Sequence, residues 1–424
     1  MTTLTADVAI AGAGLAGMSL ALDLARMGRR VVLLERRRRP GGAVLSLPGA
    51  DGADNSIHLF LSAFTRCQAR LEELGSRPHL RALDPRCHVE LQERLIRLPL
   101  GSSRLATLMG LLRVSHPQGR GIRLLVNLLR LERNPPRAGE TAAAWLARAN
   151  LPHTGPSGIA GWFWREWGLS VFNAPLERVD AGLFRRTQRA VFADPRAHRP
   201  LVADCSLDDL WVKPFERALE QAGVRLLSAT ALRGVERQGL RVEAFLADGL
   251  RVEAAQLVWA GTPEGLSRVQ GLEDCCPQLP PRSEGYHIVN LRLPCAPGLR
   301  LHELTGWFGR PFQWVFANGD GWLTLVGSGW TDDMLADRQA ILAQTPALLA
   351  QHRLAATGSP RWLVQRHATA LQSPAFEQGR PQARAPLENL FFSGAWLATG
   401  LPLSMESALA GAERTLRALQ SADL

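Results

Sequence analysis

The residues best suited to chemistry are three glycines and one acid near the start of the chain. Gly12, Gly14 and Gly17 stand in the spacing G-x-G-x-x-G, and Glu35 follows at the distance that this motif requires. The glycines permit a tight turn and let the backbone approach a diphosphate, while the acid accepts hydrogen bonds from ribose hydroxyls. The spacing therefore predicts a site for an adenine dinucleotide.

The neighbouring pattern supplies the strands and the helix that must hold these residues. An apolar run at 8–11 leads into the glycines, and the helical pattern behind them stops at Gly28. A second apolar run at 31–34 ends directly before Glu35. This order predicts strand, turn, helix and strand, with the diphosphate at a helix N-terminus that favours anions. A glycine-rich turn without a ligand is the alternative interpretation.

Length and composition allow two domains of ordinary size. The chain has 424 residues, of which 46% are hydrophobic and 21% are charged, so disordered, collagen-like and small disulfide-rich classes are excluded. Its six cysteines include no C-x-x-C pair, which matches neither a disulfide framework nor a zinc site. We therefore expect no metal and a reducing, cytoplasmic setting.

A second glycine pair decides between cofactors. Arg36 begins a run of arginines that leads to Gly41 and Gly42. This arrangement resembles the GG-type flavoproteins, the amine oxidases, phytoene desaturases and their relatives, whose second glycine motif extends the diphosphate site toward the flavin. The resemblance favours FAD over NAD. It implies an α/β fold in which a Rossmann-like FAD-binding domain of the amine oxidase type carries a discontinuous α+β substrate domain.

Two later segments resemble the remaining parts of such an FAD domain. A helix is expected at 210–222, with strands at 224–227, 241–246 and 256–260, and a C-terminal strand at 389–396 leads to a helix from Ser404. The expected FAD-binding domain comprises 1–95, 201–270 and 387–424, and the substrate domain comprises 96–200 and 271–386.

The resemblance also implies the cofactor contacts. In relatives an apolar residue lays its backbone against adenine, which Leu232 matches, although an ordinary core residue is an equal alternative. The last helix points its N-terminus at the flavin pyrimidine ring and stabilises negative charge there. The expected FAD contacts are Gly12, Gly14, Leu15, Ala16, Gly17, Glu35, Arg36, Gly41, Gly42, Leu232, Gly394, Ala395, Leu401, Pro402 and Met405.

Further motifs narrow the resemblance to the squalene-associated flavoproteins, the hydroxysqualene dehydroxylases of hopanoid synthesis. Their order along the chain matches that family at Asp54-Asn55, 58–61, 162–164, 172–175, 311–316 and 399–402 with Glu406. The resemblance implies reductive removal of a hydroxyl group from a C30 isoprenoid, with reduced FAD as the source of electrons.

Five residues depart from the family pattern at the end of the site nearer the isoalloxazine. The family has an arginine, a glycine, a glutamine, an acid and a glycine where this chain has Ala43, Ser56, Ile57, Ala395 and Ser407. Because the acid holds the ribityl hydroxyls, we expect looser or different FAD binding. Two alternatives stay open. One is a flavoenzyme resembling a carotenoid desaturase or isomerase, and the other is a non-catalytic subunit that binds a protein partner.

Breaking a C–O bond requires an acid for the leaving hydroxyl, and the motifs point to His58 and Asp54. A histidine packed beneath the sheet is an equal alternative for His58, and a turn is the alternative for Asp54. The 12 tryptophans suit a hydrocarbon tunnel, although core filling is the stronger interpretation.

The net charge of +10 suits an anionic surface, with arginine-rich genome composition as the alternative. Basic residues are not interleaved with stacking aromatics, and Tyr286 is the only tyrosine, so no nucleic-acid partner is expected.

The pattern of residues 97–133 predicts two basic amphipathic helices. We expect them to dock on the inner face of the cell membrane, where the enzyme would reach an isoprenoid lipid. A helical subdomain packed on its own protein is the alternative. The apolar runs are too short to cross a bilayer.

Overall fold

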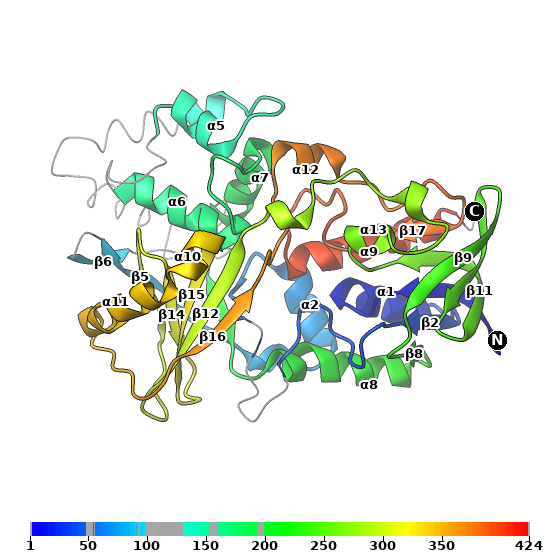
Figure 1. Ribbon diagram of the computed structural model, residues 1–424, viewed down its shortest axis with the longest axis horizontal. Coiled ribbons are helices and arrows are strands. Elements are labelled where there is room, and N and C mark those ends of the chain that lie inside the picture. Colours follow the sequence, from blue (N-terminus) through cyan, green and yellow to red (C-terminus); the bar gives the residue numbers. More distant parts are fainter. Residues whose placement is uncertain are drawn as a thin grey trace.

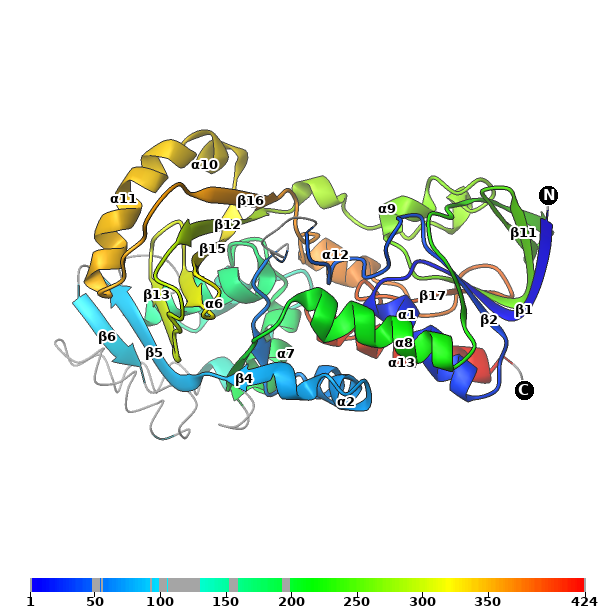
Figure 2. The same ribbon diagram turned by 90° about the horizontal axis from the view of Figure 1, so that it is seen from below.

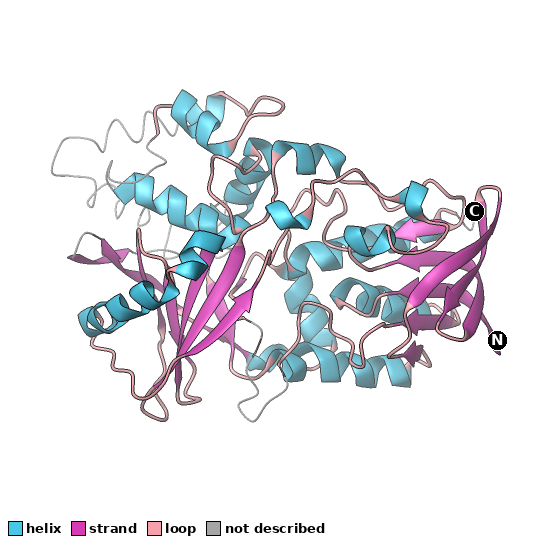
Figure 3. Cartoon of the chain, in the orientation of Figure 1, coloured by secondary structure: helices cyan, strands magenta, loops and turns pink. Residues whose placement is uncertain are grey.

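The computed structural model describes residues 2–47, 54, 56–91, 94–98, 105, 130–151, 159–192 and 199–422. Two seven-stranded sheets lie at opposite ends of the molecule, and helices fill the space between and beside them (Figure 1, Figure 3). Both termini lie beside the first sheet.

The first sheet is built from three segments that are far apart in the sequence. Its order is β8-β2-β1-β11-β10-β9, and β17 pairs with β11. The pairs of β1 with β2, β1 with β11, β2 with β8 and β11 with β17 are parallel, whereas β9, β10 and β11 form an antiparallel meander. The bounds are β1 (Thr2–Ala11), β2 (Val31–Leu34), β8 (Arg225–Leu227), β9 (Leu232–Gln238), β10 (Arg241–Ala247), β11 (Leu250–Trp259) and β17 (Leu390–Phe392).

The apolar runs become buried strands because both faces of this sheet are covered. Val8 and Ile10 pack on one face against α1 (Leu15–Arg26), α8 (Lys213–Gln221) and α13 (Met405–Gln420). Ala9 and Ala11 face a separate core on the other side. Figure 2 shows α1, α8 and α13 running side by side along the sheet. This arrangement confirms the Rossmann-like α/β fold and its assembly from discontinuous segments.

The second sheet has the order β16-β12-β15-β14-β13-β5-β6. One face packs on α10 (Asp332–Ala336) and α11 (Arg338–Gln351), and the other packs on the aromatic-rich helices α5 (Ala142–Arg148), α6 (Ile159–Phe172) and α7 (Ala181–Phe192). Its strands are β5 (Asp84–Leu91), β6 (Arg94–Leu98), β12 (His287–Pro294), β13 (Glu303–Trp307), β14 (Trp314–Ala317), β15 (Trp322–Trp330) and β16 (Arg361–Gln365).

The strand pairing moves the expected domain boundaries. β5 lies within the expected FAD-binding segment 1–95, yet it pairs in parallel with β13 of the second sheet. Conversely, Cys275 and Ala383, from the expected substrate segment 271–386, pack in a core of the first sheet. The sequence could not show this because both features depend on contacts between distant segments.

Shorter elements complete the fold. The helix expected at 210–222 begins with a π-helical turn, Asp208–Val212, and continues as α8. Leu232, which the family resemblance places in a strand, is the first residue of β9. Among the described residues no helix is long and apolar enough to cross a membrane. The remaining elements are α2 (Thr65–Glu73), α9 (Pro263–Leu266), α12 (Pro374–Gly379), short helices at Arg77–His79, Glu273–Cys275 and Arg282–Glu284, and a small sheet of β3 (Phe60–Leu61), β7 (Pro200–Ala203) and β4 (Leu80–Ala82).

Candidate functional site

The first glycine motif forms a tight turn at the carboxyl end of β1. Gly12 has a φ of +115°, and a Cβ there would lie 2.8 Å from the main chain of Ala260. A Cβ at Gly17 would lie 1.9 Å from the carbonyl oxygen of Gly12. Both positions therefore require glycine, because α1 packs directly against the ends of β1 and β11.

The second glycine pair contacts the first motif. The N–H of Gly41 donates a hydrogen bond of 2.8 Å to the carbonyl of Ala13. Gly42 has a φ of +61°, and a Cβ on it would lie 2.9 Å from Cα of Gly14. Gly14 is the N-cap of α1 and has no side chain that could accept a hydrogen bond. The N–H groups of the first turn therefore face this junction without a side-chain cap. Together these features form a backbone cradle suited to a diphosphate.

Glu35 lies at the edge of this cradle and is 7% exposed. Its Oε2 accepts a hydrogen bond from the N–H of Ala13 at 3.0 Å, and its Oε1 accepts one from the N–H of Arg37 at 2.8 Å. Each oxygen keeps a second lone pair for a hydroxyl donor. The N–H of Thr230 donates to the carbonyl of Glu35 at 2.8 Å, which places the start of β9, and with it Leu232, near the same end.

The C-terminal segment contributes a second helix, α13, whose N-terminal end also belongs to this domain. β17 leads to Gly394, and a Cβ on Gly411 of α13 would lie 2.2 Å from the carbonyl oxygen of Gly394. α13 begins at Met405, and the hydroxyl of Ser404 accepts a hydrogen bond from the N–H of Ser407 at 3.2 Å. Because α13 packs on α1, the predicted contacts near both helix ends fall in one domain.

A buried arginine organises the residues between β17 and α13. The side chain of Arg380 is 1% exposed and forms an ion pair of 2.7 Å with Glu377. Its guanidinium donates to the carbonyls of Ala395 and Leu397 at 2.8 and 2.7 Å and to the hydroxyl of Thr399 at 3.0 Å. The hydroxyl of Ser407 also donates to the carbonyl of Ala395 at 3.0 Å.

These bonds join two of the five positions that depart from the family pattern, Ala395 and Ser407. Sequence reasoning missed Arg380 because nothing in the residues around position 380 indicates its burial.

His58 is held as a neutral imidazole. Its Nδ1 lies 2.9 Å from the carbonyl of Ser56, and a carbonyl can only accept, so Nδ1 carries the proton. Burial lowers the pKa of His58, which leaves Nε2 as a proton acceptor at neutral pH. This state suits a base better than the acid role predicted for it.

Asp54 lies close in sequence to His58 but makes structural contacts. Its Oδ1 accepts hydrogen bonds from the hydroxyl of Ser46 at 2.6 Å and from the N–H of Leu207 at 2.9 Å. Burial raises the pKa of Asp54 against the effect of these bonds. Asn55, its partner in the motif, lies outside the described residues.

Glu166 on α6 is a titratable group that sequence reasoning missed. Burial raises the pKa of its carboxyl to about 7, although Arg165 and the N–H of Gly309 contact Oε1 at 2.7 and 3.1 Å. Oε2 is buried and has no hydrogen-bond partner within the described part of the chain. The sequence does contain a sign of this group, because an acidic residue stands inside the aromatic-rich run 162–167. Perturbed buried carboxyls of this kind are typical of functional sites.

The structure also brings together His79, Asp204 and Cys205, whose ligand atoms lie within 4.8 Å of one another, although no metal was expected. Burial and nearby carboxylates raise the pKa of Cys205 to about 12, so the side chain is a neutral thiol. His79 and Asp204 are exposed, and exposed groups of this kind are common without a bound ion, so we assign this cluster no chemistry.

The tryptophans of the substrate region mostly fill the core. Trp164 packs against Phe184 at a ring distance of 5.9 Å, and Trp307 is fully buried. Trp314 is half-buried and donates a hydrogen bond of 2.7 Å to the hydroxyl of Ser170. The side chain of Trp162 lies outside the described residues.

Comparison with known proteins agrees with this geometry. Residues 10–73 match the family model described as an NAD(P)-binding Rossmann-like domain. The chain is 24% identical over 417 residues to the hydroxysqualene dehydroxylase of Zymomonas mobilis, covering 94% of this chain and 95% of the relative. It is 26% identical over 424 residues to that of Sinorhizobium fredii, covering 96% and 97%. A 15-cis-phytoene desaturase from an Oncidium hybrid is 41% identical, but over only 16% of this chain and 12% of its own.

Solved structures share the fold along nearly the whole chain. An oxidoreductase from Methanosarcina mazei superposes with a TM-score of 0.73 at 12% identity, covering 98% of this chain and all of its own. A putrescine oxidase bound to putrescine gives a TM-score of 0.66 at 17% identity, covering 99% and 100%. The sequence relatives and the fold together indicate an oxidoreductase that is similar along nearly its whole length to hydroxysqualene dehydroxylases.

Proposed function

We propose that this protein binds FAD and, with the cofactor reduced, replaces the hydroxyl group of hydroxysqualene by hydrogen to give squalene. The observation that carries the proposal is the contact between the two glycine motifs beside Glu35, in a chain similar over nearly its full length to hydroxysqualene dehydroxylases.

The residues of the cradle fit the adenosine and diphosphate parts of FAD. A Cβ at Gly12 or Gly42 would collide with main chain, so glycine at these positions lets the two turns lie close together. The end of α1, where Gly14 is the N-cap, offers N–H groups to the diphosphate. Glu35 retains lone pairs for the ribose hydroxyls. At the other end, the start of α13 at Met405 would face the flavin pyrimidine ring.

Bound, reduced FAD supplies a hydride equivalent. The overall change is balanced when this hydride and one proton convert the alcohol into the hydrocarbon and water. Asp54 and Glu166 are the carboxyls with raised pKa values among the described residues, so both are suited to hold that proton. His58, neutral with Nε2 available, is suited to accept a hydrogen bond or proton.

The amphipathic segment 97–133 is proposed to bring the enzyme to the inner face of the cell membrane, where an isoprenoid lipid is dissolved. Within this segment the structure describes only the backbone of 97–98, Leu105 and residues 130–133; the rest lies outside the described residues.

The decisive experiment is the absorption spectrum of the purified protein, followed by anaerobic turnover with a chemical reductant and hydroxysqualene. We expect a flavin spectrum and formation of squalene. In a parallel assay with phytoene and an electron acceptor in place of the reductant, formation of a desaturated product would favour the desaturase-like alternative, because desaturation passes two electrons from the substrate to the flavin. A protein that stays colourless after incubation with FAD would contradict the proposal and favour the non-catalytic subunit.

A further inference from the structure

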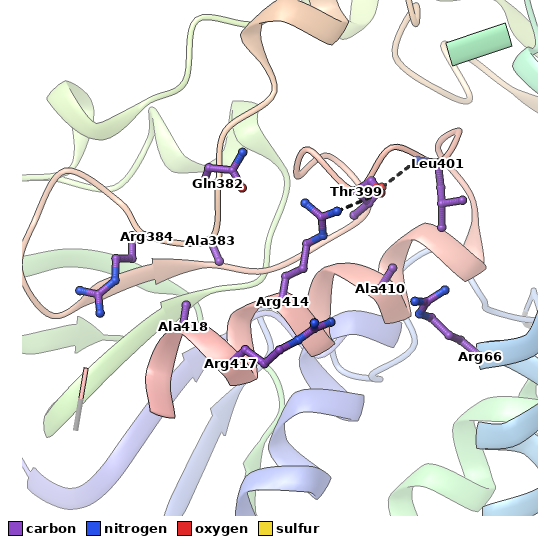
Figure 4. A pocket seen from close by; sticks show the side chains of 10 residues that line it. All are labelled: Arg66, Gln382, Ala383, Arg384, Thr399, Leu401, Ala410, Arg414, Arg417 and Ala418. Carbon is purple, nitrogen blue, oxygen red and sulfur yellow. Dashed lines mark hydrogen bonds between the residues drawn. The ribbon is translucent and has the colours of Figure 1, made fainter. Parts of the chain in front are cut away.

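A cavity of about 580 Å³ lies beside α13, outside the cradle described above. Figure 4 shows the side chains that line it, which come from α2, α13 and the segments 382–384 and 399–401. Among the described residues that line it, none is acidic, and every charged one is an arginine. The polar lining consists of Arg66, Gln382, Arg384, Thr399, Arg414 and Arg417.

The helical repeat explains how the cavity forms. Ala410, Arg414 and Ala418 recur every four residues, and Arg417 lies seven residues after Ala410, so all four share one side of α13. The two alanines have short side chains, which leaves room between the arginines. The opposite side of α13, represented by Ala412 and Leu419, packs into the core.

The arginines are held in different ways. Arg414 donates hydrogen bonds to the carbonyls of Ala398 and Thr399, the latter at 3.2 Å, which fixes its guanidinium beside the loop. Arg417 is exposed, as is Arg384, whose guanidinium lies over the ring of Phe391 at 5.7 Å. The loop and the helix thus present guanidinium groups to the same space.

Two carboxylates partly compensate this charge. Glu413 accepts from Arg66 at 2.9 Å and lies 3.8 Å from Arg417, and Glu406 lies 3.3 Å from Arg66. Four arginines against these two glutamates leave a local charge of about +2. Such an excess in a concave site raises the local concentration of anions.

We propose that this cavity binds a phosphate group, carried either by a soluble phosphate ester or diphosphate or by a phospholipid headgroup. Guanidinium groups match phosphate oxygens in paired hydrogen bonds, and the side chains of Gln382 and Thr399 add neutral polar groups. Of the expected FAD contacts only Leu401 lines the cavity, so this site is separate from the cradle and does not depend on the proposed reaction.

The test uses the full chain with excess FAD, so that the cradle is occupied. Inorganic pyrophosphate is titrated by calorimetry, and sedimentation is measured with phosphatidylcholine vesicles with and without phosphatidic acid. The variant is Arg384→Gln with Arg417→Gln, because both side chains are exposed and their loss should spare the fold. The control is Arg225→Gln with Arg268→Gln, two exposed arginines outside the cavity with the same change of charge.

We expect saturable binding that is at least tenfold weaker in the cavity variant and unchanged in the control. Binding of pyrophosphate alone identifies a soluble ligand, whereas binding only to vesicles with phosphatidic acid identifies a headgroup. Equal weakening in both variants would show general attraction to a basic protein and would overturn the proposal. Lack of saturable binding to either probe would overturn it as well.

Discussion

The main-chain N–H of Ala13 donates a 3.0 Å hydrogen bond to Oε2 of Glu35, which ties the glycine turn after β1 to the acid after β2. The bond fixes the carboxylate at the mouth of the cradle and fills only one of its acceptor positions. A structural contact and a proposed ribose contact thus use the same side chain.

Substituting Glu35→Gln should weaken FAD binding by tenfold or more. The amide has one acceptor oxygen where the carboxylate has two, so it cannot serve both Ala13 and Arg37, and it lacks the charge that strengthens bonds to hydroxyls. The FAD dissociation constant, measured by flavin fluorescence, checks this. Glu236→Gln, at a surface ion pair on β9, is the control and should bind FAD normally.

Gly42→Ala should abolish tight FAD binding because the new Cβ would lie 2.9 Å from Cα of Gly14 and separate the two motifs. Gly28→Ala is a matched control, since Gly28 also has a positive φ, +80°, but has nothing within 4 Å of its Cβ position. Both variants should lose about 1 kcal/mol of unfolding free energy from backbone strain. Equal FAD affinity in the two variants would argue against the cradle.

Ala395→Asp should raise FAD occupancy. A carboxylate at this position gains a charge-assisted hydrogen bond worth about 1.5–3 kcal/mol, which corresponds to roughly tenfold or more in affinity. Ala395→Asn offers a hydrogen bond without the charge and should give a smaller gain. If flavin content per protein is the same in all three forms, the ribityl contact lies elsewhere.

Glu166 should make the protein less stable as the pH rises. Its carboxyl ionises near 4.5 in the unfolded chain and near 7 in the folded one, so the folded state loses stability between these values. At about 1.4 kcal/mol for each pH unit, the loss is about 3 kcal/mol above pH 7. Denaturant unfolding of the wild type and Glu166→Gln from pH 4.5 to 8 should show this difference.

The control for that experiment is Glu140→Gln. The hydrogen bonds from Arg148 hold the pKa of Glu140 below its ordinary value, so its stabilising effect is present at neutral pH and is lost on acidification. The two variants should therefore change the pH dependence in opposite directions. A Glu166→Gln curve parallel to that of the wild type would show that this carboxyl ionises at its ordinary pKa.

Replacing Leu108 and Leu112 with glutamate should release the protein from membranes, because charged side chains on the apolar face oppose insertion into the interface. Sedimentation with anionic vesicles measures this. Met27 and Leu240, 51% and 60% exposed, replaced in the same way, provide a control with equal charge change. Continued sedimentation of the Leu108 and Leu112 variant would contradict the docking proposal.

The sequence alone predicted the opening unit of the fold, because strand, turn, helix and acid follow one another within a short stretch. The runs at 8–11 and 31–34 fall within β1 and β2, and the helix expected from Ser404 begins at Met405 with Ser404 as its N-cap. The family resemblance supplied the discontinuous domain. These features depend on local pattern or on motif order, both of which are visible in one dimension.

Only the tertiary structure decided the rest. The pairing of β5 with β13, the burial of Glu166, the bonds of Arg380 and the gathering of Arg66 with the arginines of α13 all join segments far apart in the chain. Burial and neighbouring charge set the pKa of a carboxyl and the potential of a cavity, and both depend on what other segments place nearby. Residue types indicated which chemistry was available, but packing determined where it is located.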